Sequence, residues 1–295
     1  MNVAARLLGF AASLALIFGT AWWAGTLTAV PGGSAPLPPV DEHAAVALPP
    51  DRAIGIEATG LVSTAVGYRV VPRGTTTFKA GVAAEFAFVV TGPGGRPVTA
   101  FDVKDGRPMD LVVVGRDGAG FQHVLPVIGA GGVWTAQLHL PAAGVYRAYA
   151  TFVPTGGPEL VLGVELSVAG KFAPEALTTS RTTRVDDYTV RLDADLVAGT
   201  RSEVFVAIDR NRLPVLDVEP RFGAPGQLVV VRQGDMARLR VAPLTIASDD
   251  AHRGGQAFAF TVEVPDAGVH RLFVEFQHDG VVRAAAFTVT TGSGQ

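Results

Sequence analysis

The sequence predicts an all-β protein in which one N-terminal transmembrane helix is followed by two tandem immunoglobulin-like β-sandwiches. A motif at residues 141–152 recurs at residues 265–276, each time as a turn containing proline and glycine that leads into an alternating apolar run. Many short apolar runs separated by glycine and proline precede both copies, which is typical of sandwiches. The third observation is a run of 24 uncharged residues, 7–30, near the N-terminus.

Composition narrows the classes of function. The chain has 295 residues, which allows two domains, and 48% of them are apolar, enough for cores without disulfide bonds. A net charge of −3, with few aromatic residues near lysine or arginine, argues against nucleic acid as a partner. The chain has no cysteine, so disulfides, thiolate nucleophiles and cysteine metal sites are excluded.

Residues 1–32 are predicted to form a membrane anchor. At about 1.5 Å per residue, the uncharged run is long enough to cross a hydrocarbon layer of about 30 Å as a helix. Arg6 precedes the run, and Asp41 is the first charged residue after it. The positive-inside rule then places the N-terminus in the cytoplasm and the rest of the chain outside a cell membrane that it crosses once.

A cleaved signal peptide is the alternative for this segment. Signal peptides have an apolar region of about 7 to 15 residues, followed by a cleavage site with small residues. The run here is longer and no such site is obvious, so an uncleaved anchor is the better prediction. Both alternatives export the remaining chain.

The remaining chain divides into two linkers and two predicted sandwich domains. Residues 33–66 are rich in proline and are predicted to be an extended linker. The first sandwich is predicted at residues 67–170 and the second at residues 187–291. Between them, residues 171–186 are polar and lack periodicity, so we expect a second linker there.

The two predicted sandwiches can be aligned over much of their length. The apolar run 111–114 matches 228–231, and Tyr146 matches His270. His270 thus takes a core aromatic position, and we expect a buried, hydrogen-bonded structural histidine there. Strict alternation around His139 places that side chain on the solvent side of its strand.

Two loops of the second sandwich contain candidate binding residues. The Asp-Gly dipeptide after His278 predicts a two-residue hairpin, which places His278 at an end of the sandwich where binding residues commonly sit. The second copy also carries seven extra residues in a surface loop. That loop holds Asp249, Asp250 and His252, whose oxygen and imidazole ligands are candidates for a cation site. A solvated loop is the simpler alternative, because the spacing matches no specific site.

Three segments, residues 121–126, 141–152 and 276–283, resemble a known family. They are similar to an uncharacterised family of actinobacterial secreted or membrane-anchored proteins with tandem β-sandwich domains and, more loosely, to the YtkA-like domains. The resemblance implies a role in copper or other heavy-metal handling, because members often carry His-x-His-Pro where residues 123–126 and 240–243 stand here. It implies no established activity.

His123 alone remains of that histidine pattern. Leu125, Arg240 and Ala242 stand where the other imidazoles would be, and a single histidine cannot chelate a metal. A pairing of His123 with His278 across strands is the copper or zinc site that we carry forward from this resemblance.

The leading hypothesis is a non-enzymatic binding or interaction module, tethered outside the membrane, with an unidentified protein partner and no cofactor. Exposed loops at the ends of sandwiches suit binding. The alternative is an accessory protein in copper or heavy-metal handling, with a partly lost site at His123 and His278. An enzyme would need a nucleophile held beside a histidine, and no serine here lies in a nucleophile-elbow sequence.

The anchor prediction is tested by alkaline carbonate extraction of membranes that contain the full-length protein. We expect the protein to stay in the membrane pellet, because a bilayer-spanning helix resists this treatment. Leu16→Arg should release it, since a charge at the centre of a spanning helix costs about 2.5–3.5 kcal/mol, whereas Leu37→Arg in the proline-rich segment should not. Complete extraction of the wild type would favour a cleaved signal peptide.

Overall fold

The computed structural model describes residues 58–244 and 256–292. Over these residues the regular structure is β-strand, apart from the short 3-10 segment Ala130–Gly132. The predicted transmembrane helix, most of the first linker and the loop with the candidate cation ligands lie outside the described residues. No helix in the described part is long and apolar enough to span a bilayer.

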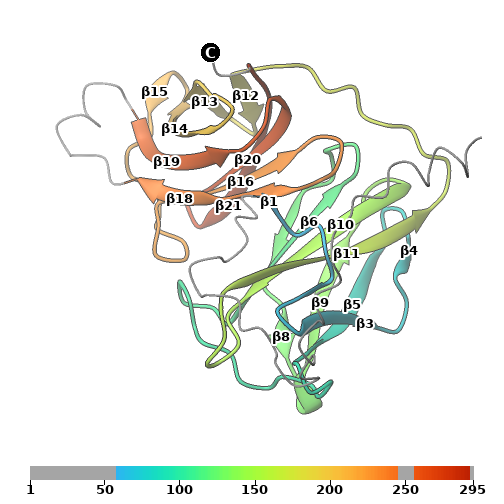
Figure 1. Ribbon diagram of the computed structural model, residues 1–295. Coiled ribbons are helices and arrows are strands. Elements are labelled where there is room, and N and C mark those ends of the chain that lie inside the picture. The colour runs from blue at the N-terminus through green and yellow to red at the C-terminus, as the bar shows by residue number, and fades with distance from the viewer. Residues whose placement is uncertain (1–57, 245–255, 293–295) are drawn as a thin grey trace, which may run out of the picture. The chain divides into compact units, whose positions relative to one another are not determined.

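The first repeat contains two five-stranded sheets around one core (Figure 1). One sheet has the strand order β2 (Thr64–Ala65), β3 (Tyr68–Arg73), β5 (Ala83–Thr91), β9 (Val133–His139) and β8 (Val127–Ile128). The other has the order β4 (Thr77–Lys79), β11 (Leu160–Ala169), β10 (Gly144–Phe152), β6 (Met109–Gly115) and β7 (Gln122–Val124).

The second repeat also contains two sheets around a core of its own. One has the order β12 (Thr182–Val185), β13 (Tyr188–Ala194), β14 (Thr200–Arg210), β19 (Gln256–Val264) and β18 (Val241–Leu244), with β15 (Leu213–Pro214) paired to β14. The other has the order β1 (Ala58–Thr59), β17 (Arg238–Leu239), β16 (Gly226–Arg232), β20 (Gly268–His278) and β21 (Val281–Thr291).

Alternation along the strands decides which side chains enter each core. In β9, Trp134, Ala136 and Leu138 are buried, whereas Gln137 and His139 are exposed, as predicted for a strand with one solvated face. The buried rows of the facing sheets form one apolar cluster in each repeat. The all-β, sandwich-like fold predicted from the sequence is therefore confirmed.

The two repeats pack against each other through equivalent sheet faces. All seven residues of β6 are buried, and β16 is nearly as buried, so both strands are covered on both sides. Their outer faces meet in a third apolar cluster, which includes three equivalent pairs: Val112 and Val229, Val114 and Val231, Tyr149 and Phe273. Contact between the same face of two copies is the arrangement of an isologous dimer, here within one chain.

Short strands occur inside both predicted linkers. β1 and β2 lie within residues 33–66, and β12 lies within residues 171–186. β1 pairs with β17 of the second repeat, with Ala58 opposite Leu239, so the chain ahead of the first repeat extends a sheet of the second. Strands of two to four residues carry too few side chains for a periodic signal, which is why the sequence did not predict them. The remaining domain boundaries stay predictions.

The predicted hairpin after His278 is confirmed. β20 and β21 pair with His278 opposite Val281, which leaves a two-residue turn. Asp279 and Gly280 in that turn have φ angles of 54° and 70°. Two successive positive φ angles are the mark of a type I′ turn, and an Asp-Gly dipeptide adopts them at little cost.

Gly163 packs against the segment ahead of the first repeat, so its substitution tests whether that segment lies there. A Cβ atom on Gly163 would lie 1.9 Å from the carbonyl oxygen of Gly60 and 2.9 Å from Arg147 Nε. Gly163→Ala should therefore lower the free energy of unfolding by about 1–3 kcal/mol in urea denaturation, the usual cost of overpacking. Gly94→Ala, where a Cβ meets nothing within 4 Å, is the matched control. Equal stability of the two variants would contradict the docking.

Candidate functional site

His123 lies between carboxylates from the two repeats. It belongs to β7, where it pairs with Val112 of β6. Its Nε2 atom is hydrogen-bonded to the side chain of Asp110 on β6, and its Nδ1 atom to that of Glu275 on β20. The exposed fractions of the three side chains are 2% for His123, 7% for Asp110 and 6% for Glu275. The imidazole therefore bridges the two repeats away from water.

The face of β20 that meets the first repeat places Glu275 at this point. Arg271, Phe273 and Glu275 share one face because side chains alternate along a strand. Arg271 Nε donates to the carbonyl oxygen of Gly118 at 2.8 Å, and the Phe273 ring stacks on Phe121 with the ring centroids 4.4 Å apart. Successive side chains of this face thus contact successive parts of one loop and strand of the first repeat.

Three arginines surround the two carboxylates. Arg107 Nε and Arg238 Nη2 lie 3.6 Å and 3.7 Å from the two oxygens of Asp110. Arg221 Nη1 donates to Glu275 Oε1 at 3.3 Å. Each buried carboxylate therefore has the imidazole on one side and at least one guanidinium on another, which compensates for the loss of hydration.

The bridge shifts the pKa values of its members in opposite directions. Burial by itself lowers the pKa of His123, but the hydrogen bonds and charges of Asp110 and Glu275 outweigh it and raise that pKa. Burial by itself raises the pKa of Asp110, but the contact with His123 and the charges of Arg238 and Arg107 bring that pKa well below its usual range. His123 is then an imidazolium whose two N–H groups each donate to one carboxylate.

This arrangement suits a structural role for His123. A general base or a metal ligand needs a nitrogen lone pair that faces substrate or metal. Both ring nitrogens of His123 are occupied by carboxylates, and the side chain is almost fully buried. The chemistry available to it is proton binding coupled to contact between the repeats.

The structure does not bring His123 and His278 together. Glu275, the partner of His123, and His278 are three residues apart on β20, so their side chains point to opposite faces of the sheet. His278 Nδ1 is 2.8 Å from the hydroxyl oxygen of Tyr188, and its Nε2 is 3.3 Å from Asp217 Oδ1.

The second predicted cation site cannot be compared with the structure. Asp249, Asp250 and His252 lie outside the described residues. Within the described ranges, no three or more His, Asp or Glu side chains are grouped so that they could hold a metal ion.

His270 occupies the predicted core position but lacks the predicted hydrogen bonds. Its side chain is fully buried, and neither ring nitrogen has a partner of ordinary hydrogen-bond geometry among the described residues. Burial lowers the pKa of His270, and the nearby backbone of Gly268 offsets this only in part. His270 is therefore a neutral core side chain.

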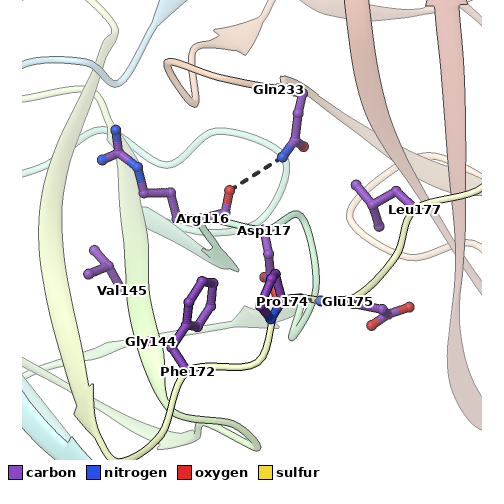
Figure 2. Close-up of a pocket in the computed structure, with 9 residues that line it drawn as sticks. All are labelled: Arg116, Asp117, Gly144, Val145, Phe172, Pro174, Glu175, Leu177 and Gln233. Atoms are coloured by element: carbon purple, nitrogen blue, oxygen red, sulfur yellow. Dashed lines mark hydrogen bonds between the residues drawn. The ribbon is translucent and has the colours of Figure 1, made fainter.

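A second feature is a groove of about 600 Å³ where the segment between the repeats crosses the first of them (Figure 2). Its apolar lining includes Val145 at the start of β10 together with Phe172, Pro174 and Leu177 of the connecting segment. The ring of Phe172 is half exposed. Gly144 makes this close approach possible, because a Cβ there would lie 2.9 Å from the ring. We call this feature the Phe172 groove.

Polar contacts hold the walls of the Phe172 groove. The backbone N–H of Glu175 donates to Asp117 Oδ2 at 3.2 Å, and Gln233 Nε2 donates to the carbonyl oxygen of Arg116 at 3.4 Å (Figure 2). The groove thus combines both repeats and the segment between them. Sequence reasoning missed it, because a single phenylalanine in a segment without periodicity was its only signal.

Comparison with known proteins finds a family model that matches the region of the second repeat. Residues 183–293 match a domain of unknown function, DUF8832. No curated protein matches the chain.

Several solved structures share a distant likeness. A mutant Salmonella alpha-2-macroglobulin is 14% identical with a TM-score of 0.25, and Escherichia coli alpha-2-macroglobulin is 12% identical with a TM-score of 0.26. Each comparison covers 80% of this chain and 15% of the other, so this chain spans a small part of those proteins. A chimeric titin Z1Z2-Z1Z2 tandem is 13% identical over 74% of this chain and 95% of its own, with a TM-score of 0.20. TM-scores of this size support no inference about function.

The His123 bridge predicts a stability that falls as the pH rises. Because folding raises the pKa of His123, its contribution is fully present below the unfolded pKa of about 6.5 and is lost as the pH rises through the folded pKa. Folding depresses the pKa of Asp110, so its contribution is present above about pH 4 and is lost at lower pH. Urea denaturation from pH 4 to 9 should therefore show a maximum near pH 4–6.5.

Substitution of His123 shows whether the fall in stability with rising pH comes from this side chain or from other titrating groups. His123→Gln should lower the free energy of unfolding at pH 6 by about 3–5 kcal/mol, because it leaves buried carboxylates without their shared cation, and should flatten the decline above pH 6.5. His139→Gln, at an exposed histidine, should change neither. A decline that persists unchanged in His123→Gln would show that another group causes it.

Proposed function

We propose that this protein is a non-enzymatic binding module, anchored in the cell membrane and facing outward, with two immunoglobulin-like sandwiches joined into one unit. The anchor and the outward location are supported by the uncharged run at residues 7–30 and by the resemblance to exported proteins. The immunoglobulin-like description is supported by two repeats, each with two mostly antiparallel sheets around one core.

The Phe172 groove is the observation that carries the binding role. It combines a half-exposed aromatic ring with an apolar floor, which is the composition of a protein-binding surface at its centre. Its walls are held by hydrogen bonds of Asp117 and Gln233, so little ordering is required on binding. A preorganised groove of this kind suits a binding protein.

We propose an extended peptide segment of a partner protein as the occupant. An apolar side chain of that segment would pack against Phe172, Val145 and Leu177. Arg116 and Glu175 are both exposed and carry opposite charges along the groove. They would select an acidic and a basic residue on the two sides of the apolar one.

The copper or zinc alternative has weaker support. To bind a metal, His123 would have to release both carboxylates that now occupy its nitrogens. At His278 the structure brings Asp217 within 3.3 Å of Nε2 and Asp279 within 3.6 Å of Nδ1. The two carboxylates face different nitrogens of one imidazole, so these groups do not make a complete site for either metal.

Peptide display tests the proposed function. Random peptides would be selected on the full-length protein after depletion on Phe172→Ser. We expect enriched peptides that bind the wild type and bind Phe172→Ser at least tenfold more weakly, because the central aromatic contact is lost. Arg116→Glu should change the preferred charge next to the apolar residue. Leu213→Ser, at a leucine exposed elsewhere, is the matched control and should bind like the wild type.

Two results would contradict this function. One is the absence of peptides that distinguish the wild type from Phe172→Ser. The other is a hydrolase activity of the full-length protein that a single substitution abolishes, since such an activity would replace the non-enzymatic proposal.

A further inference from the structure

We propose that Arg107 and Arg221 bind an oxyanion, the phosphate or carboxylate group of a small ligand, at the rim of the interface between the repeats. This site is distinct from the Phe172 groove and does not depend on the proposed binding of a peptide there. The observations that carry it are a pair of equivalent turns, an aromatic ring that contacts two guanidinium groups, and an excess of positive charge.

Equivalent turns of the two repeats meet at this rim. Residues 104–107 and 221–224 each close with a reciprocal pair of backbone hydrogen bonds between their first and last residues. The central residues of both turns have positive φ angles: 50° and 76° in the first repeat, 55° and 76° in the second. Arg107 closes the first turn, and its guanidinium carbon lies 3.9 Å from the ring centroid of Phe222 in the second.

Phe222 is an unusual residue for its position. Its φ angle of 55° is in the left-handed region, which bulky residues avoid at a cost of about 1–3 kcal/mol. The equivalent residue of the first repeat is Asp105, a common residue in such turns. Strain of this kind points to a function of the ring itself.

The function of the ring is to orient two guanidinium groups. Arg107 lies 3.9 Å and Arg221 lies 4.4 Å from the centroid of Phe222. Stacking on a ring occupies the flat face of a guanidinium and leaves its N–H edge free for in-plane hydrogen bonds. Both groups contact one ring, and the charge of Arg221 acts on Arg107. An oxyanion that accepts from both N–H edges would offset this repulsion.

The surroundings have more positive than negative charge. The buried carboxylates are those of Asp110 and Glu275. When His123 is protonated, four cations face them: His123, Arg107, Arg221 and Arg238. Asp105 is close enough to act on Arg107 but is exposed to solvent. An excess of positive charge remains after this third carboxylate is counted, so the rim favours an anion and repels a metal cation.

Arg107 has the unused hydrogen-bonding capacity that a ligand would fill. Its Nη1 atom is buried and has no hydrogen-bond partner among the described residues. Its contact with Asp110, from Nε at 3.6 Å, is too long for a hydrogen bond. The Arg107 and Arg221 side chains are 14% and 19% exposed, so a ligand would approach through their exposed atoms and would reach Nη1 only after a side-chain movement.

Titration of the full-length protein with inorganic phosphate tests the proposal. Ionic strength is held constant with sodium chloride, and binding is followed by ³¹P line broadening and by the midpoint of thermal unfolding. We expect saturable binding at one site. Arg107→Gln and Arg221→Gln should each weaken it at least tenfold, and Arg96→Gln, at an exposed arginine of the same repeat as Arg107, should not. A parallel titration with acetate distinguishes a phosphate from a carboxylate ligand by which ion binds more tightly.

Results with the wild type and results with the variants can each overturn the proposal. Absence of saturable binding of both ions at millimolar concentrations would do so, as would binding that both Gln variants retain. If a variant fails to fold, the arginine Nε–H signals of the wild type still locate the ion by NMR. Shifts that centre on Arg107 and Arg221 support the site, and shifts centred elsewhere contradict it.

Discussion

Burial of carboxylates at the contact between two sheets requires cations in fixed positions, and the His123 bridge meets that requirement. Asp110 and Glu275 come from different repeats and are both almost without water. Two such groups side by side would repel each other and raise each other's pKa. The imidazolium of His123 between them, with Arg221 and Arg238 beside them, turns this repulsion into a link between the repeats. Removal of one member of such a link would cost more than the link itself contributes to stability, because a buried charge would be left without its partner.

The interface also shows how a duplicated domain adapts to contact with its own copy. In both repeats the two interface positions are cross-strand neighbours: Asp110 pairs with Thr151, and Gln227 pairs with Glu275. One member of each pair is an acid and the other is neutral. Acids at all four positions would bury two more negative charges in the same interface, and each would add its own cost of desolvation. The two copies thus differ at these positions within an otherwise equivalent contact.

Much of the fold could be predicted from the sequence, because local patterns encode it. The repeat, the hairpin after His278, the exposed face of His139 and the core position of His270 all depend on alternation or on turn chemistry within a few residues. Contacts between the repeats could not be predicted in the same way. Glu275 meets His123 across 152 residues, and no local pattern selects that partner.

One signal of the interface was nevertheless present in the sequence. The runs 111–114 and 228–231 are solidly apolar where a strand with one solvated face would alternate. Continuous apolar strands are buried on both faces, so these runs mark the sheets that a second layer covers. The two-residue strands β1 and β2 and the Phe172 groove lacked any comparable signal, since they depend on which distant segments lie beside them.

Differential scanning calorimetry of the full-length protein at pH 6 tests most directly whether the two repeats form one unit. If the bridge and the third apolar cluster join them, both repeats unfold in one transition, and the ratio of calorimetric to van't Hoff enthalpy is about 1. Two separate transitions, or a ratio of about 2 within one peak, would show that the repeats unfold independently and would contradict the account.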